Sequence, residues 1–445
     1  MDAVSKNKKV QEYADDTVID TIKAFIYSFI GIFIFFVPIK LDGTYRTLLY
    51  HMSYKVQYDM NSFLKLCIIT FIFLGFIKPF IMKGSKETPN KLFIIKKVVS
   101  LIIIANIFYG TKDTFIVSEN TMFIIEEFIF NIATLLPLTS IFMVFLLNYG
   151  ALEIVESFCH KLMKTTFKIS GKTILNILIY ISTDCFCGFF ITNSMYKKGK
   201  LRQNEAIFLI LNFSIASIPS ISYVCSELEI NKFALICTSL LILIISNAII
   251  CRIYPLNKKK KSYYIKTTYK ETIHKHDKFK KGLKKYLKNK PTTNIFKDIV
   301  DNLEESFKVV SNLIPDIIIV LFIGDIIINS EFIIELVKYA IDPFVGVLKL
   351  IDAQQVNEFI ISVFLNDILA IENVSRNVEY TSKFIISIIF VIKGISLSSN
   401  IIYMKNMDIS ISKKDFMLVY IERILLIMGL YLIIYCSFKG YNSII

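Results

Sequence analysis

The chain has 445 residues, of which 54% are hydrophobic, and its mean hydropathy is +0.56. A soluble globular protein usually carries less apolar material, so the composition indicates a membrane protein. The net charge of +14 does not indicate RNA or DNA binding, because fourteen lysines gather in one stretch, 257–291, as in a cytoplasmic loop that faces anionic lipid.

Apolar runs of close to twenty residues predict helices that cross a bilayer core of about 30 Å. These runs are apolar on every side and lack the strict alternation of barrel strands. The eight cysteines lie mostly inside apolar stretches, and Cys185 and Cys187 have no histidines at ligand spacing, so we expect neither disulfides nor a metal or other cofactor. No nucleophile is paired with a base, and we expect no enzyme.

The first predicted elements are four spans at 21–39, 61–82, 92–109 and 128–147. Lys83, Lys86 and Lys91 follow the second span, and a lysine-rich connection follows the fourth. Cytoplasmic connections carry an excess of lysine and arginine. We therefore predict a multi-pass protein of the bacterial cytoplasmic (inner) membrane with a cytoplasmic N-terminus.

The next apolar stretch, 174–191, is predicted to be a re-entrant hairpin. A basic cluster follows it as well as precedes it, so both of its ends look cytoplasmic. Its centre is polar, with Ser182, Thr183 and Asp184. About eight helical residues on each side rise about 12 Å. The tip is therefore predicted near the middle of the bilayer, where irregular backbone must be buried in protein or line a wet cavity.

The remaining predicted elements mirror this arrangement. Two spans, 206–224 and 231–253, lead to the basic loop, and 309–328 crosses outward. A second hairpin, 359–371, is centred on Asn366 and Asp367 and enters from the outside. The last predicted spans are 384–404 and 416–434.

The two halves repeat with opposite orientation. Each half has a span broken by a proline (Pro137, Pro315), an interfacial helix (151–167, 331–348), a hairpin and two closing spans. We therefore predict an all-α polytopic membrane protein with about nine transmembrane helices and two re-entrant hairpins in an inverted repeat, as in many secondary transporters. The predicted units are N-terminal helices 1–120, a first repeat 121–254, a basic cytoplasmic loop with an amphipathic helix 255–308, and a second repeat 309–437.

Polar side chains near mid-depth are the candidates for substrate or ion binding. A charge at the bilayer centre costs at least about 2.5 kcal/mol, so Asp184 and Asp367 are expected to contact a solute or a cation, with structural pairing or a solvated tip as the alternative. For Asp316 and Lys393, an ion pair between Lys393 and either Asp316 or Asp367 is the alternative to binding. For Asn193, a hydrogen bond between helices is the alternative to a cavity contact. The full set is Ser182, Thr183, Asp184, Asn193, Asp316, Asn366, Asp367 and Lys393.

Several stretches resemble the YjiH-like membrane proteins, which carry the Gate or nucleoside-recognition domain. The resemblance covers nearly the whole chain and rests on 28–39 (SFIGIFIFFVPI), 135–139 (LLPLT), 161–171 (KLMKTTFKISG), 190–206 (FITNSMYKKGKLRQNEA) and the closing pair Glu422 and Arg423. Its most specific part is the spacing of Thr192, Tyr196, Gly199 and Glu205. The resemblance implies transport, with repeats similar to those of concentrative nucleoside carriers, and leaves the substrate open.

We therefore expect a secondary carrier or gated permease in the lipid bilayer for a small polar solute, such as a nucleoside-like molecule or an ion. The SGKT run at 170–173 lacks the earlier glycine of a phosphate loop, so we expect transport to be driven by a gradient, with Na⁺ or H⁺ as the coupling cation, or alternatively by a partner. The alternative is a non-transporting membrane scaffold connected with the cell envelope or spore development. A homo-oligomer is compatible with the sequence, and no nucleic-acid partner is expected.

Overall fold

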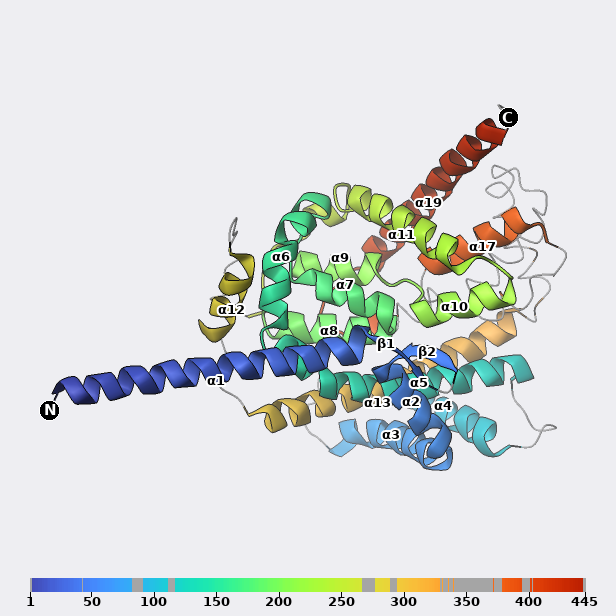
Figure 1. Ribbon diagram of the computed structural model, residues 1–445. Coiled ribbons are helices and arrows are strands. Elements are labelled where there is room, and N and C mark those ends of the chain that lie inside the picture. The colour runs from blue at the N-terminus through green and yellow to red at the C-terminus, as the bar shows by residue number, and fades with distance from the viewer. Residues whose placement is uncertain are drawn as a thin grey trace.

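Helices form almost all of the described part of the computed structural model, together with one two-stranded ribbon (Figure 1). The structure describes residues 2–41, 43–81, 91–110, 117–265, 277–288, 294–328, 378–393 and 403–442, with the single residues 330, 335, 339, 371 and 401. The second predicted hairpin, 359–371, and the second interfacial helix, 331–348, lie outside this part except for isolated residues.

Within the described residues, five helices are long and apolar enough to cross a membrane. They are Val18–Phe36 within α1 (Asp2–Phe36), α4 (Lys91–Tyr109), Thr121–Leu147 within α5 (Glu119–Leu147), α11 (Lys232–Ile250) and Ile295–Ile326 within α13 (Ile295–Ile328). Large apolar side chains such as Phe29 and Phe233 stand exposed on them, 68% and 78% respectively, which suits contact with lipid. The chain is thus an all-α protein whose apolar helices fit a membrane.

Helices α5 and α13 pack antiparallel, and the N-terminal helices pack against this pair. Asn148 at the end of α5 donates to Asp298 near the start of α13 at 2.9 Å, and the hydroxyls of Ser140 and Ser306 lie 3.4 Å apart. At the other end, Thr121 donates to the Asp325 carboxylate at 2.6 Å. These contacts join both ends and the middle of the two helices, with α3 (Asn61–Ile81) and α4 packed against α13.

Prolines do not break these two helices as the sequence suggested. Pro137 lies inside the continuous helix α5 and Pro315 inside the continuous helix α13. A proline removes only one backbone hydrogen bond, and a helix inside a packed bundle tolerates that loss. Because α13 begins at Ile295, the predicted boundary between the basic loop and the second repeat at 308 falls inside a helix.

The first span is followed by a sharp corner. Strands β1 (Pro38–Leu41) and β2 (Thr44–Thr47) pair antiparallel around Gly43, whose φ of +80° favours glycine. Helix α2 (Leu48–Asp59) then packs on α5 and meets α3 at a bend of 97°. The predicted span at 61–82 is therefore α3, and the ribbon and α2 are an addition that brings residues 46–61 over α5.

The stretch predicted as the first hairpin forms two packed antiparallel helices. Helix α7 (Thr173–Ser182) and helix α8 (Cys185–Lys197) are joined only by 183–184. Asn176 donates to Thr192 at 3.1 Å across the pair, and the hydroxyl of Tyr180 lies 3.2 Å from Thr192. Gly188 allows this approach, because a Cβ there would lie 2.4 Å from the Tyr180 ring. The amphipathic helix predicted at 151–167 is α6 (Ala151–Thr166).

The predicted continuous span at 206–224 is wrong. Helix α9 (Gln203–Asn212) and helix α10 (Ile218–Glu227) are separated by non-helical backbone at 213–217. Pro219 supplies the physical reason, since proline is favoured in the first turn of a helix, whereas inside a continuous helix it would lack the N–H that bonds to the carbonyl four residues earlier. Ser217 occupies the N-cap position of α10.

Three further helices complete the described fold. Helix α12 (Lys278–Lys288) packs against α6, while α17 (Tyr380–Lys393) and α19 (Lys413–Asn442) pack against α11 (Figure 1). The largest fully buried side chains include Tyr180, Tyr403 and Phe189, and the rings of Phe189 and Tyr403 lie 5.0 Å apart. The hydrophobic core therefore extends around the α7–α8 hairpin.

Candidate functional site

A cavity of about 700 Å³ lies at the tip of the α7–α8 hairpin. Its walls come from the β2–α2 corner, the first half of α5, the hairpin tip, the break between α9 and α10, and α17. The cavity lining combines aromatic rings with amides, hydroxyls and a few charged groups. The lining residues are Arg46, Tyr50, Ser53, Tyr54, Gln57, Asn61, Phe123, Glu126, Glu127, Phe128, Phe130, Asn131, Asp184, Phe186, Ile215, Ala216, Ser217, Ser220, Tyr223 and Phe390. Such a mixture suits a solute with both polar and flat apolar parts.

Asp184 is the hairpin-tip residue that lines this cavity. Its side chain is half-buried, and as the N-cap of α8 it accepts a hydrogen bond from the Phe186 N–H at 2.8 Å. Thr183 is fully buried and donates to the carbonyl of Ile179 at 2.7 Å, and the buried hydroxyl of Ser182 has no protein partner in the described structure. Of the three predicted tip residues, only the aspartate therefore presents its side chain to the cavity.

The break between α9 and α10 forms the wall next to Asp184. Ala216 and Ser217 both line the cavity, and the Ala216 N–H donates to Val391 of α17 at 3.0 Å. A discontinuous helix beside a binding cavity is the arrangement found at the solute sites of many transporters. Residues 173–227 thus bring a hairpin tip and a broken helix to one place.

Two buried side chains from distant helices satisfy the backbone that the break exposes. Arg423 of α19, only 3% exposed, donates to the carbonyls of Leu211 and Ile392. Asn247 of α11 is also fully buried and donates to the carbonyl of Asn212 at 3.1 Å. The last carbonyls of a helix lack partners within that helix, and a cation near them is favourable. Arg423 and Asn247 therefore stabilise the break.

Amides and hydroxyls form a connected group on the α2–α5 side of the cavity. The side-chain amide nitrogen of Gln57 lies 3.0 Å from the Ser53 hydroxyl and 3.0 Å from the Thr134 hydroxyl. It also lies 3.1 Å from the side-chain amide oxygen of Asn131. Ser53 and Thr134 are 2.6 Å apart. A network of this kind holds its members in fixed positions, and three of them, Ser53, Gln57 and Asn131, line the cavity.

Charged groups near α2 have partners at the cavity wall. The Arg46 guanidinium lies 5.0 Å from the centre of the Tyr54 ring, which is a cation–π geometry. The Glu126 carboxylate pairs with Lys65 of α3 at 3.1 Å. These contacts fix the corner between β2, α2 and α3 against the first half of α5.

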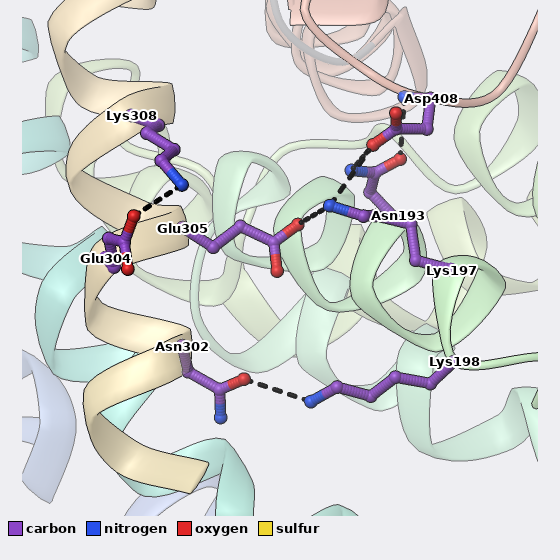
Figure 2. Close-up of polar contacts among 8 residues, drawn as sticks. All are labelled: Asn193, Lys197, Lys198, Asn302, Glu304, Glu305, Lys308 and Asp408. Carbon is purple, nitrogen blue, oxygen red and sulfur yellow. Dashed lines mark hydrogen bonds and ion pairs between the residues drawn. The ribbon is translucent and has the colours of Figure 1, made fainter. Parts of the chain in front are cut away.

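The opposite end of the hairpin is closed by a polar group that we call the hairpin-end cluster, consisting of Asn193, Lys197, Lys198, Asn302, Glu305 and Asp408. Figure 2 shows Lys197 between the carboxylates of Glu305 on α13, at 2.9 Å, and of Asp408, at 3.5 Å. Lys198 donates to Asn302 at 3.0 Å. The cluster therefore joins α8 to α13 and to the segment before α19.

Asn193 is a predicted site residue that belongs to this cluster rather than to the cavity. Its side-chain oxygen accepts from the Asp408 N–H at 3.0 Å, and its amide nitrogen lies 3.4 Å from the Asp408 carboxylate (Figure 2). Burial opposes the charged form of Lys197, but the hydrogen bond and charge of Glu305 and the charge of Asp408 outweigh it, so the pKa of Lys197 is raised. The cluster thus keeps Lys197 charged.

The other predicted residues do not meet at the cavity within the described structure. Asp316 forms an ion pair with Lys96 at the interface of α13 and α4. Lys393 ends α17, and its side chain lies outside the described residues, as do Asn366 and Asp367. The sequence-based set therefore divides between the cavity, the hairpin-end cluster and a separate ion pair.

Sequence reasoning missed most of the cavity wall. Pro219 after Ser217 was the available signal for the broken helix, and the Asp42-Gly43 pair between short apolar runs was the signal for the ribbon before Arg46. The hydrogen bond of Arg423 to the Leu211 carbonyl, 212 positions away, has no local signal in the sequence. In the described part of the chain, no group of three or more histidine, cysteine, aspartate or glutamate side chains is placed to hold a metal ion.

The chain is similar to one curated protein, an uncharacterized protein of Alkalihalophilus pseudofirmus. The two are 22% identical over 284 residues, which cover 59% of this chain and 61% of the relative. The chain therefore matches less than two thirds of that relative's length. No protein-family model matches the chain, and no solved structure matches it.

Proposed function

We propose that this chain is a secondary carrier or gated permease for a small polar solute in the bacterial cytoplasmic membrane, with a cytoplasmic N-terminus. The observation that carries the proposal is the cavity in which Asp184, at the tip of a buried hairpin, lies beside the break between α9 and α10. An aspartate in the apolar part of a membrane protein is costly and usually functional. Membership of the YjiH-like Gate family is part of the same proposal.

Asp184 binds the solute or a coupling cation, Na⁺ or H⁺, in this mechanism. Ser217, Gln57 and Asn131 supply neutral hydrogen-bonding groups around it, and the aromatic rings of the wall cover the apolar parts of the solute. With the charge-based topology, residues 40–60 and the start of α5 lie outside. The cavity then opens to the outside, which supports an outward-facing arrangement.

The hairpin-end cluster is the closed cytoplasmic side of this pathway. Lys197 and Lys198 attach α8 to α13, and Lys197 and Asn193 attach it to Asp408 (Figure 2). Alternating access requires one side to close while the other is open. Release of these contacts would allow the hairpin to move away from α13 and open the cytoplasmic side.

The antiparallel packing of α5 and α13 supports the inverted repeat. These are the two proline-containing helices that correspond in the proposed repeats, and Ser118 of α5 contacts Asp325 of α13 while Asn148 contacts Asp298. Helices that correspond in inverted repeats must run in opposite directions, as these two do. Asn366 and Asp367, the predicted tip of the second hairpin, lie outside the described residues.

Asp184→Asn tests the proposal, with Asp277→Asn as the matched control. Asp277 lies before α12, and its φ of +56° suits asparagine equally well. A thermal-shift screen with nucleosides, purine bases, carboxylates, Na⁺ and Fe²⁺ identifies the ligand, because binding to the folded form raises its apparent stability. The expected result is uptake of that ligand into proteoliposomes by the wild type and by Asp277→Asn.

In Asp184→Asn the same uptake should fall at least about tenfold, because a hydrogen bond to a charged group contributes about 1.5 to 3 kcal/mol. Undiminished uptake by a folded Asp184→Asn protein would contradict the proposed site. If no solute stabilises the wild type and no uptake is measured, the non-transporting scaffold becomes the better reading, and Asp184→Asn should then leave its protein complexes intact.

A further inference from the structure

Helix α12 carries its lysines on one side. At about 100° per residue, Phe279, Gly282, Leu283, Tyr286 and Leu287 fall within one arc of the helix. The remaining arc is filled by the six lysines of the helix, Lys278, Lys280, Lys281, Lys284, Lys285 and Lys288. A helix that is polar on average with strong separation of the two faces is typical of segments that lie in a membrane surface.

Part of the apolar arc attaches α12 to α6. Gly282 lies against the α6 backbone, where a Cβ would come within 2.8 Å of the Ile154 Cα, and Tyr286 is 95% buried. Lys285 pairs with Glu156 of α6 at 3.0 Å, and Ser157 donates to the Lys278 carbonyl at 2.8 Å. These contacts fix the direction of the lysine arc relative to the rest of the protein.

The other part of the apolar arc reaches the first membrane span. The ring of Phe279 stacks on the ring of Phe25 in α1, with centroids 5.5 Å apart. Phe25 belongs to the segment Val18–Phe36 and its side chain is 46% exposed. Its neighbours Ile22 and Ile26 are each 53% exposed. Phe25 lies seven residues, or about 10 Å of helix rise, beyond Val18. The apolar arc of α12 therefore packs against the first half of this span, and Lys280, Lys284 and Lys288 are exposed one turn apart along the outer face of α12.

We propose that Lys280, Lys284 and Lys288 bind the anionic headgroups of phospholipids in the cytoplasmic leaflet, so that α12 is an interfacial helix attached to both protein and lipid. Anionic lipid is complementary to the lysine stripe, and the Phe279–Phe25 contact holds α12 against the first half of the span, from which long lysine side chains extend to the headgroups. The proposal is independent of whether the protein transports a solute.

A fluorescent reporter on α12 tests this directly. The chain contains no tryptophan, so Leu287→Trp gives the full-length protein a single emitter beside the lysine stripe. In bilayers containing brominated phosphatidylglycerol or brominated phosphatidylcholine, quenching measures how each lipid associates with the helix. We expect at least roughly fivefold stronger association of phosphatidylglycerol, since each lysine near an anionic surface contributes several-fold. High salt should reduce this preference.

The decisive variant replaces Lys280, Lys284 and Lys288 with glutamine in the reporter protein, and it should lose most of the preference. The matched control makes the same three-charge change at Lys258, Lys260 and Lys261, which are exposed in the same basic loop but not on α12, and it should retain the preference. Thermal unfolding in uncharged detergent verifies that both are folded. Equal quenching by the two lipids, an equal loss in the control, or displacement of the lipid by added RNA would each overturn the proposal.

Discussion

The two ends of the α7–α8 hairpin differ in what surrounds them. At the Asp184 end the surrounding helices leave a cavity of about 700 Å³. At the Lys197 end, α8, α13 and the segment before α19 are in contact through the hairpin-end cluster. The same two short helices thus have one open and one closed end. This asymmetry is what a gated pathway needs. Substitutions at Gly188, Lys197 and Lys200 each alter one part of it.

The close packing of the hairpin itself should have the largest effect on stability. Gly188→Ala adds a Cβ that would lie 2.4 Å from the Tyr180 ring, so Tyr180 or the helix must shift. Overpacking of a buried site costs about 1 to 3 kcal/mol. We expect a clearly lowered unfolding temperature in detergent, together with loss of ligand binding, because Asp184 and Lys197 depend on the same pair of helices.

Gly324→Ala is the control for this change, because nothing lies within 4 Å of the added Cβ in α13. Alanine is the better helix former by about 1 kcal/mol, so this variant should be as stable as the wild type or more stable. Equal unfolding temperatures for Gly188→Ala and the wild type would show that the hairpin is less tightly packed than described.

The closed end should respond more weakly, because its charged groups are partly exposed. Lys197→Gln and Glu305→Gln each remove the same ion pair, whose side chains are 37% and 21% exposed. We expect each to lower stability by about 1 kcal/mol or less. The double variant should lose little more than either single variant, which a double-mutant cycle of thermal or urea unfolding measures.

Lys308→Gln is the matched control for the closed end. Among the described residues, the ion-pair partner of Lys308 is Glu304 of the same helix, at 2.6 Å (Figure 2). Both side chains are more than half exposed. Removal of Lys308 should leave stability unchanged and should show no coupling to Glu305→Gln. Additive losses for Lys197→Gln and Glu305→Gln would mean that the pair does not hold the end closed.

The difference between the two ends also separates what sequence could predict from what it could not. Charge clusters and a polar centre predicted the hairpin and its tip, because both signals are local. The break before Pro219 was missed, since the apolar run at 206–224 outweighed one proline in the prediction. The contacts of Lys197 with Glu305 and Asp408 join residues more than 100 positions apart, and no periodicity encodes them.

The smallest effect concerns Lys200, which lies just beyond the closed end and donates to the Leu147 carbonyl at 2.7 Å. Burial lowers the pKa of Lys200 from 10.5 to about 8, with the charge of Glu153 opposing the shift. At a pH between about 8 and 10.5, Lys200 is more protonated in the unfolded chain than in the folded one. The contribution of Lys200 to the free energy of unfolding therefore rises as the pH increases through this range.

Lys200→Met lacks that titration. The unfolding temperature of the wild type relative to Lys200→Met should therefore increase between pH 7.5 and pH 9.5. We expect an increase of roughly a degree or two, because one group contributes little to the free energy of unfolding of a chain of this length. Lys280→Met, at an exposed position of α12, should show a constant difference over the same range. A constant difference for Lys200→Met would mean that Lys200 stays hydrated in the folded protein, and the closed end would then extend no further than Lys198.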